Sequence, residues 1–379
     1  MIRKIFSVSF VVVLTLTTLW AFGETAQADT VKIGIVAEMS GTGARVGARW
    51  ERGILLAVEE INASGGLLGK KIETYTLDTK TEPPVSVAAM KKAIEQKPFV
   101  IMGTVYSSST IVNMGILQQA GIPQIVGSEA TGVTQKGNPN IFRTSYSTFL
   151  AMKKLTRYIL EGFDTKKLAV IYANDTFGKS GRDAIAELTE GKAQLVADIA
   201  TEVGQTDFAG EIARLQRSGA DTLYFQVHEE EGARMMMQIK EAGLKINCAT
   251  YGTDITHIAD LAKSDADGLV GIDLPAEALP IMPLNKKYQA KYGEEVDAEA
   301  VKGYVGTYVV KATVEKVGSF DQQKFRDTLH NSTIYVKDEP GVLMDISYDE
   351  NGDIDRISFL VEIKNGKVTI KETLPPLKK

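Results

Sequence analysis

Four consecutive hydroxyl side chains at residues 107–110 form a concentrated polar group in this sequence. They follow a short apolar run at residues 99–102 and begin a helical pattern at residues 107–119. The first turn of a helix has free backbone N–H groups and the positive end of the helix dipole, so Ser107 and Ser108 are well placed to bind a carboxylate or another small anion. Serine is also a common helix cap, but one hydroxyl is enough for that role.

Other polar and aromatic groups follow further strand patterns. The loop at residues 128–131 comes directly after the next apolar run, and Phe177 and His228 each follow an apolar run in the second half of the chain. Ligands of α/β proteins bind at the carboxyl ends of the strands. Each position alone has a structural explanation, but together they mark four strand ends in two halves of the chain. This placement predicts one binding site that both halves share.

The motifs of known catalytic sites are incomplete. A glycine pattern at residues 41–47 has its third glycine one residue too late for a dinucleotide-binding fingerprint. Residues 178–182 resemble a nucleophile elbow, but arginine stands where the second glycine belongs. His257 and His330 have no acidic or thiol partners at the spacing of metal ligands. We therefore expect no catalytic residues, no metal site and no cofactor.

The composition excludes several classes of protein. The 379 residues carry a net charge of -5, with 43 lysine and arginine residues against 48 aspartate and glutamate residues. There is no basic excess to neutralise a phosphate backbone, so we expect no nucleic-acid partner. The single Cys248 cannot close an intramolecular disulfide.

Residues 1–28 have the features of a signal peptide. Arg3 and Lys4 precede an uncharged apolar stretch at residues 5–22, and a small-x-small motif ends at Ala28. The alternative is an uncleaved membrane anchor, because the apolar stretch is slightly long for a signal peptide. No positive flank follows the stretch, so we predict an exported protein that is cleaved after Ala28 and is not embedded in the membrane.

The rest of the chain alternates strand and helix patterns with short connections that contain glycine. Such alternation produces βαβ crossovers and parallel sheets, and the length favours two α/β lobes over one large sheet. The pair Asn365-Gly366 between two alternating runs predicts a β-hairpin. The expected strands are at residues 31–36, 72–77, 99–102, 123–126, 168–172, 194–199, 222–227, 245–250, 269–272, 357–363 and 367–370, and the expected helices at residues 50–61, 85–96, 107–119, 151–160, 178–188, 208–216, 232–242, 284–292, 298–317 and 321–329.

Six phrases distributed along the chain carry a family resemblance. They are VKIGIVAEMSG from residue 31, AVEEINASGGLLGKKIE from 57, YSSST from 106, GIPQIVGSEATGVTQKGNPNIFRTS from 121, ANDTFGKSG from 173 and KEAGLK from 240. With them, nearly the whole mature chain resembles the periplasmic solute-binding proteins of branched-chain amino-acid ABC importers, which have the type I periplasmic binding protein fold.

This resemblance implies an α/β fold of two Rossmann-like lobes with parallel sheets joined by three hinge crossovers. The first lobe would contain residues 29–147 and 276–355, and the second lobe residues 148–275 and 356–379. The ligand would bind in the cleft between the lobes, which closes by a hinge motion. The resemblance also implies a monomer in the periplasm that delivers a small-molecule solute to an inner-membrane ABC permease.

The resemblance further implies which residues contact the ligand. A carboxylate-binding serine falls on Ser107 beside Ser108, and the contacts of a second loop fall on residues 128–131. The aromatic residue that closes over the ligand falls on Phe177, and a second wall residue, usually tyrosine, falls on His228. The full set of predicted ligand-binding residues is Ser107, Ser108, Ser128, Glu129, Ala130, Thr131, Tyr146, Phe177, His228 and Asp254.

The sequence departs from the family at the cation end of this site. The family's ammonium-binding acid falls near Gly252, where this chain has no carboxylate in register and offers Asp254 two residues later. A buried ammonium without a carboxylate is costly, so an amino acid would need Glu129 or Asp254 to supply the charge. We expect a small carboxylate or amide-like solute, aliphatic or aromatic, with a branched-chain or other amino acid as the alternative.

Two other functions remain as alternatives. A ligand-binding module of a sensory receptor uses the same bilobed fold, but it would carry a transmembrane and signalling segment after the lobes, whereas this sequence ends in a hairpin and a short lysine-rich tail. An exported α/β enzyme is the other alternative, and the incomplete catalytic motifs count against it.

Overall fold

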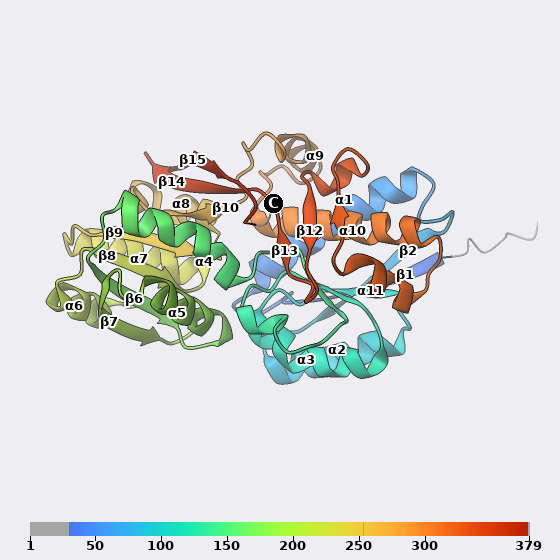
Figure 1. Cartoon of the computed structure of the whole chain (residues 1–379), viewed down its shortest axis with the longest axis horizontal. Helices are drawn as coiled ribbons and strands as arrows, with labels where there is room; N and C mark the ends of the chain where they lie inside the picture. The colour runs from blue at the N-terminus through green and yellow to red at the C-terminus, as the bar shows by residue number, and fades with distance from the viewer. Residues whose placement is uncertain (1–29, 253, 378–379) are drawn as a thin grey trace, which may run out of the picture.

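The computed structural model describes residues 30–252 and 254–377. Within these residues the chain forms two α/β lobes, each built around its own sheet, with a small third sheet beside the first (Figure 1). The predicted α/β fold with two lobes is confirmed. The predicted signal peptide and its cleavage site after Ala28 lie outside the described residues. No helix in the described part of the chain is long and apolar enough to cross a membrane.

The first lobe is built on a parallel sheet with the strand order β2-β1-β3-β4-β5. The chain starts near the middle of this sheet, moves to one edge and then crosses to the other side. A sheet wound in both directions has helices on both faces. The strands are β1 (Thr30–Ala37), β2 (Lys71–Asp78), β3 (Val100–Met102), β4 (Gln124–Val126) and β5 (Ile141–Arg143), and the main helices are α1 (Ala44–Ala63), α2 (Pro83–Glu95), α3 (Ser107–Ala120) and α10 (Ala298–Val317).

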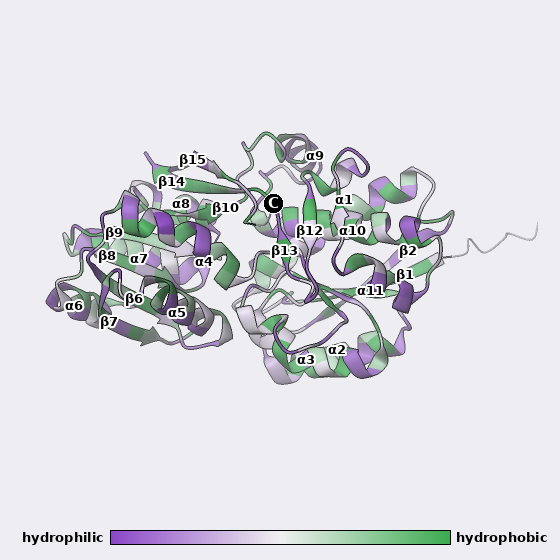
Figure 2. Cartoon of the chain, in the orientation of Figure 1, coloured by the Kyte–Doolittle hydropathy of each residue, from purple (hydrophilic) through white to green (hydrophobic). Residues whose placement is uncertain are grey.

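The two faces of this sheet have separate cores because side chains alternate along a strand. Ile33 and Ile35 of β1 belong to the core that contains Trp50 of α1, whereas Val36 belongs to a core with Met90 of α2. Figure 1 shows α1 and α10 along one side of the lobe and α2 and α3 along the other. Hydrophobic and hydrophilic residues accordingly alternate along these helices (Figure 2).

The second lobe is built on a mixed sheet with the strand order β15-β14-β10-β9-β8-β6-β7. Its first five strands along the chain are parallel, and the predicted hairpin adds two antiparallel strands next to β10. Asn365 and Gly366 have φ angles of 53° and 69°, as a type I′ turn requires. The strands are β6 (Lys167–Ala173), β7 (Gln194–Thr201), β8 (Thr222–Gln226), β9 (Asn247–Tyr251), β10 (Val270–Asp273), β14 (Ser358–Lys364) and β15 (Lys367–Leu374).

Helices cover both faces of the second sheet as well. Leu168 and Val170 of β6 share a core with Met152, whereas Ala169 and Ile171 belong to the core that contains Met235 on the opposite face. The first of these faces carries α4 (Thr148–Arg157) and α5 (Thr176–Thr189), and the other carries α6 (Ala209–Ser218), α7 (Glu229–Glu241) and α8 (Ile255–Ala262). Both α5 and α7 begin directly after a strand, so their first turns lie at the strand ends.

Some elements are too short to give a periodic signal in the sequence, and none of them is predicted by it. They include β5 and the small antiparallel sheet of β11 (Thr333–Ile334), β12 (Ile346–Tyr348) and β13 (Ile354–Asp355). The expected helices at residues 284–292 and 321–329 are present as α9 (Met282–Tyr292) and α11 (Gln322–Leu329).

The described chain passes between the lobes three times. It leaves the first lobe between β5 and α4, returns between β10 and α9, and leaves again between β13 and β14. We call these connections the three crossovers. The predicted lobe boundaries at residues 147, 275 and 355 stay predictions, because no independent observation locates them.

The packing of α1 on α10 requires glycine at the contact. A Cβ atom on Gly53 would lie 2.0 Å from the carbonyl oxygen of Ala300. We expect Gly53→Ala to lower the free energy of unfolding by about 1–3 kcal/mol, because overpacking forces the two helices apart. The measurement is a chemical denaturation curve of each purified variant.

The matched control is Gly115→Ala in α3, where a Cβ atom would have nothing within 4 Å. Alanine is the better helix former, so this substitution should leave the free energy of unfolding unchanged or raise it by up to about 1 kcal/mol. Equal effects of the two substitutions would contradict the close contact at Gly53.

Candidate ligand-binding site

Two adjacent cavities lie between the lobes. The cleft cavity has walls from both lobes and a volume of about 350 Å³, counted together with the solvent space at its mouth. The crossover cavity includes residues from all three crossovers and has a volume of about 410 Å³ counted in the same way. They share Glu129, Gly252 and Glu299. The cleft cavity is further lined by Val46, Val105, Tyr106, Ser107, Gly127, Phe177, His228 and Glu229, and the crossover cavity by Tyr146, Tyr251, Asp254, Ile272, Asp273, Leu274, Ala298, Lys302, Arg356 and Ser358.

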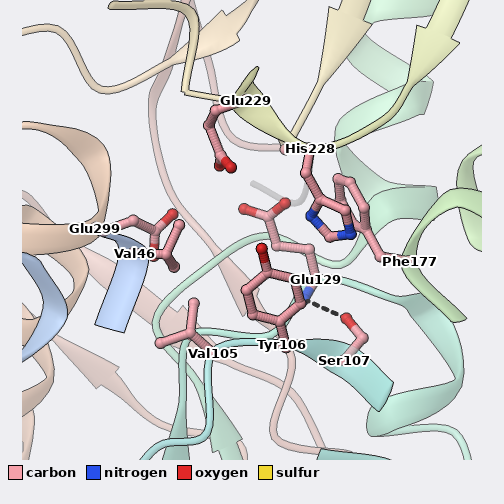
Figure 3. A pocket seen from close by; sticks show the side chains of 11 residues that line it. Val46, Val105, Tyr106, Ser107, Glu129, Phe177, His228, Glu229 and Glu299 are labelled. Carbon is pink, nitrogen blue, oxygen red and sulfur yellow. Dashed lines mark hydrogen bonds between the residues drawn. The ribbon is translucent and has the colours of Figure 1, made fainter. Parts of the chain in front are cut away.

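The hydroxyl-rich start of α3 forms one wall of the cleft cavity. Ser107 is buried, and its Oγ accepts hydrogen bonds from the backbone N–H groups of Glu129 at 3.3 Å and Ala130 at 3.1 Å (Figure 3). Behind this wall, the fully buried Glu38 accepts hydrogen bonds from the backbone N–H groups of Val105 and Tyr106 at 3.2 and 3.3 Å. Burial raises the pKa of Glu38 to about 7, although these hydrogen bonds favour its charged form.

The loop after β4 is fixed in place by Arg143. The guanidinium of Arg143 is fully buried and donates hydrogen bonds to the carbonyl oxygens of Ser128 at 2.6 Å and Ala130 at 2.7 Å. It also forms an ion pair with Asp353 at 2.5 Å. Charge-assisted hydrogen bonds of this kind are stronger than neutral ones and more directional. They hold the backbone of the loop so that Glu129 extends into both cavities.

The second lobe supplies an aromatic wall with a positive charge. His228 and Phe177 lie at the starts of α7 and α5, and their rings stack with centroids 5.4 Å apart. The His228 ring also lies 4.6 Å from the Tyr106 ring of the first lobe. Burial opposes the charged form of His228, but the hydrogen bond to Asp175 at 2.9 Å outweighs it and raises the pKa of His228 to about 9. His228 is therefore cationic at neutral pH.

A buried lysine joins two of the carboxylates. The Nζ atom of Lys302 lies 2.7 Å from Glu129 and 2.6 Å from Glu299, and all three side chains are at least nine-tenths buried. Burial raises the pKa of Glu299 to about 8, although Lys302 favours its charged form. The second oxygen of Glu299, Oε2, is buried and has no hydrogen-bond partner among the described residues. It is an acceptor that remains available at the boundary of the two cavities.

Glu229 adds a carboxylate that the sequence analysis missed. It follows His228, lines the cleft cavity and forms no salt bridge with any described residue. Figure 3 shows the carboxylates of Glu129, Glu229 and Glu299 directed towards the same space as the Tyr106 hydroxyl. The sequence analysis considered Glu129 and Asp254 as the source of a negative charge at this site, and the structure adds Glu229 and Glu299 as candidates. The rule that strand ends carry the site would have found Glu229, whereas Glu299 and Lys302 look like an ordinary helical ion pair.

Polar contacts hold the lobes together beside the cavities. Arg45 of α1 forms an ion pair with Asp254 of the second lobe at 2.9 Å and with Asp297 of the first lobe at 3.1 Å. The backbone N–H of Thr131 donates a hydrogen bond to Ser180 of α5 at 2.9 Å. With the Tyr106–His228 ring contact, these contacts join the two lobes directly beside the cavities.

The structure brings some of the predicted site residues to the cavities and leaves others outside. Ser107, Glu129, Phe177 and His228 line the cleft cavity, and Tyr146 and Asp254 line the crossover cavity together with Glu129. The predicted residues that line neither cavity are Ser108, Ser128, Ala130 and Thr131; the last three belong to the loop that Arg143 and Ser180 hold. No group of His, Cys, Asp and Glu side chains in the described chain could hold a metal ion.

Comparison with known proteins assigns the chain to a class. A family profile described as periplasmic binding protein matches residues 30–367. A Leu/Ile/Val-binding protein of Rhizobium johnstonii is 26% identical over 94% of this chain and 98% of its own length. A leucine-specific-binding protein of Salmonella typhimurium is 28% identical over 89% of this chain and 92% of its own length.

Solved structures share the fold. The branched-chain amino-acid transporter binding protein of Streptococcus pneumoniae, in complex with isoleucine, matches with a TM-score of 0.81 at 24% identity and covers 92% of this chain and 100% of its own. A solute-binding protein of an ABC transporter from R. palustris, in complex with benzoate, matches with a TM-score of 0.81 at 22% identity and covers 92% of this chain and 98% of its own. At such identities the likeness concerns the fold alone.

The pair of His228 and Asp175 makes the stability of the protein depend on pH. Folding raises the pKa of His228 from 6.5 to about 9, so protonated His228 stabilises the folded state fully below pH 6.5, and this contribution is lost as the pH rises through about 9. Asp175→Asn keeps a side chain that can cap α5 but removes the charge. We expect this variant to melt below wild type at low pH, with a difference that shrinks across this range. Thermal melts at the two ends of the range measure it, and a difference independent of pH would contradict the role of Asp175.

Proposed function

Because this chain belongs to the periplasmic binding protein family, we propose that it captures a small carboxylate-bearing solute between its lobes and delivers it to an ABC permease in the inner membrane. The family and the relatives are binding proteins of transporters and not enzymes, which confirms the prediction that the chain has no catalytic role. The observation that carries the proposal is the cleft cavity, whose wall combines polar groups from both lobes. A solute that touches both walls stabilises the closed arrangement.

The cavity offers opposite poles to a solute. The Ser107 hydroxyl at the start of α3 and the cationic His228 suit a carboxylate. The acceptor oxygens of Glu229 and Glu299 suit an ammonium or amide N–H group. Burial raises the pKa of Glu299 to about 8, and a bound ammonium would favour its charged form. A solute with both groups would satisfy both poles, which supports an amino acid or an amide more strongly than the sequence does. We choose the acids to be tested from the similar proteins: leucine, isoleucine and valine from the names of the relatives, and benzoate from the solved complex.

The three crossovers between the lobes suggest how the cleft closes over a solute. We propose that residues 29–147 and 276–355 move against residues 148–275 and 356–379 about the three crossovers. The contacts between the lobes beside the cavities include an ion pair, a hydrogen bond and one ring contact, and a bound solute that touches both walls adds further contacts that hold the lobes closed. We further propose that the protein acts as a monomer in the periplasm after cleavage behind Ala28, and that the permease recognises the closed form.

A thermal-shift screen tests this function. The panel contains L-leucine, L-isoleucine, L-valine, polar amino acids, benzoate, short aliphatic acids and their amides. A ligand at about one hundred times its Kd stabilises the folded state by about 2.7 kcal/mol, which raises the melting temperature measurably. Calorimetry with each stabilising compound then gives the Kd. If no member of the panel raises the melting temperature, the proposed solute class is wrong.

Glu229 distinguishes solutes that carry an ammonium from those that do not. For an amino acid that the protein binds, we expect Glu229→Gln to weaken binding by about 1.5–3 kcal/mol, the usual value of a hydrogen bond to a charged group. The deaminated analogue, such as isocaproate for L-leucine, should bind both proteins equally. Calorimetry on the matched pair measures the difference.

The control is Glu230→Gln, one residue later on α7, where the carboxylate is 43% exposed and faces His257. It should leave both affinities unchanged. An equal loss of affinity for amino acid and deaminated acid in Glu229→Gln would place the ammonium elsewhere.

A further inference from the structure

Arg356 lines the crossover cavity and is a buried cation whose guanidinium has unused hydrogen-bond donors. It lies in the last crossover, between β13 and β14, and is 1% exposed. Its Nε and Nη1 atoms have no acceptor among the described residues, and it forms no salt bridge with them. The guanidinium lies over the ring of Tyr146, 5.8 Å from the ring centroid.

An unpaired buried guanidinium is costly to the folded protein. Burial lowers the pKa of Arg356, although neighbouring groups including Glu129 favour the charged form. Arginine stays protonated in proteins, so this cost is not relieved by loss of the proton. A planar guanidinium binds a carboxylate with two parallel hydrogen bonds, so the unused Nε and Nη1 donors fit that partner.

The other charges in the same cavity are largely cancelled or neutral. Lys302 is already engaged by Glu129 and Glu299, and Asp254 is engaged by Arg45. Burial raises the pKa of Asp273 to about 8, which favours its neutral form at neutral pH. Among the described residues that line the crossover cavity, Arg356 is therefore the cation that lacks a partner.

The two cavities adjoin at Gly252, which lines both of them together with Glu129 and Glu299. A Cβ atom at this position would lie 2.0 Å from the Glu129 carboxylate and 2.6 Å from the Phe177 ring, and Gly252 also has a φ of 75°, which side chains other than glycine rarely adopt. A side chain at this position would collide with Glu129 and Phe177, so glycine allows these two residues to pack closely where the cavities adjoin. A solute held in the cleft cavity reaches Arg356 across this boundary, past Gly252 and the side chain of Glu129.

We propose that Arg356 binds a second carboxylate at the far end of the solute, so that the protein selects an amino acid with an acidic side chain or a similar dicarboxylate. This inference rests on the proposed function and names the class of solute. The first carboxylate lies at Ser107 and His228, and the ammonium lies at Glu229 and Glu299. The side chain of the solute passes Gly252 and places its own carboxylate at Arg356.

The test uses amino-acid pairs of equal length that differ only in the terminal group: L-glutamate with L-norvaline, and L-α-aminoadipate with L-norleucine. Calorimetry on the full mature protein gives each Kd. We expect wild type to bind at least one acidic member more tightly than its neutral partner by tenfold or more. Arg356→Met should weaken binding of that acidic member roughly ten- to hundredfold and leave the neutral member unchanged.

A second readout separates ligand binding from a structural role. Arg356→Met replaces an unpaired buried charge by an apolar side chain of similar length, so the ligand-free variant should melt at or above the temperature of wild type. The control is Arg157→Met on α4, which removes an arginine that is 51% exposed and paired with Glu372, and it should change no affinity.

Three results would overturn the inference while the proposed function stands. They are tighter binding of the neutral members by wild type, unchanged binding of acidic members by Arg356→Met, and a lower melting temperature of this variant with equal loss for both members of a pair. L-glutamine bound as tightly as L-glutamate would also overturn it, because the site would then not require an anion. If wild type binds no amino acid or acid of either panel, the proposed function fails, and this inference fails with it.

Discussion

The site depends on the buried guanidinium of Arg143. The loop after β4 has no regular secondary structure of its own at Glu129, yet this residue must extend into two cavities at once. Arg143 supplies the missing order, because it binds the carbonyl oxygens of Ser128 and Ala130 and is itself neutralised by Asp353. Asp353 precedes the last crossover, so the same ion pair links the position of the loop to the segment that leads into the second lobe. Without that interaction neither cavity would have a defined wall.

The charged side chains between the lobes are of two kinds: those that form ion pairs and those that do not. Lys302 forms ion pairs with two glutamates, and Arg45 of α1 forms ion pairs with two aspartates at the starts of α8 and α10. Glu229 and Arg356 form no ion pair with a described residue, and one oxygen of Glu299 and two nitrogens of Arg356 have no hydrogen-bond partner there. Unpaired polar groups are rare in protein interiors because they reduce stability, and these three residues line the two adjacent cavities. These groups lower the free energy of unfolding of the ligand-free protein, but they are available to select a solute.

The sequence predicts the fold and half of the site for a clear physical reason. Strand and helix periods are local, and ligands of α/β proteins bind where strands end, so Ser107, Phe177 and His228 can be located without a structure. The rest depends on contacts between distant segments. Glu299 and Lys302 sit three residues apart on a helix, where such a pair is usually solvated, so their spacing alone does not indicate that both side chains are buried. Arg356 belongs to a crossover whose neighbours, Tyr146 and Tyr251, come from far earlier in the chain. The short strand β5 escapes prediction because three residues carry no period.

The close approach of α1 and α10 at Gly53 and Gly303 has a consequence for how the polypeptide acquires its structure. Helix α10 starts at residue 298, after the parallel strands of the second lobe have been made, yet it covers a face of the sheet that begins at residue 30. Contacts between segments so far apart form slowly, because a long loop must close before they contribute any stability. Until α10 is synthesised, one apolar face of the first sheet is covered only in part, by α1. The hairpin β14–β15 completes the second sheet only at the very end. Neither lobe can therefore mature before nearly the entire polypeptide is present, so carboxyl-terminal truncation should yield aggregation-prone intermediates instead of a surviving half.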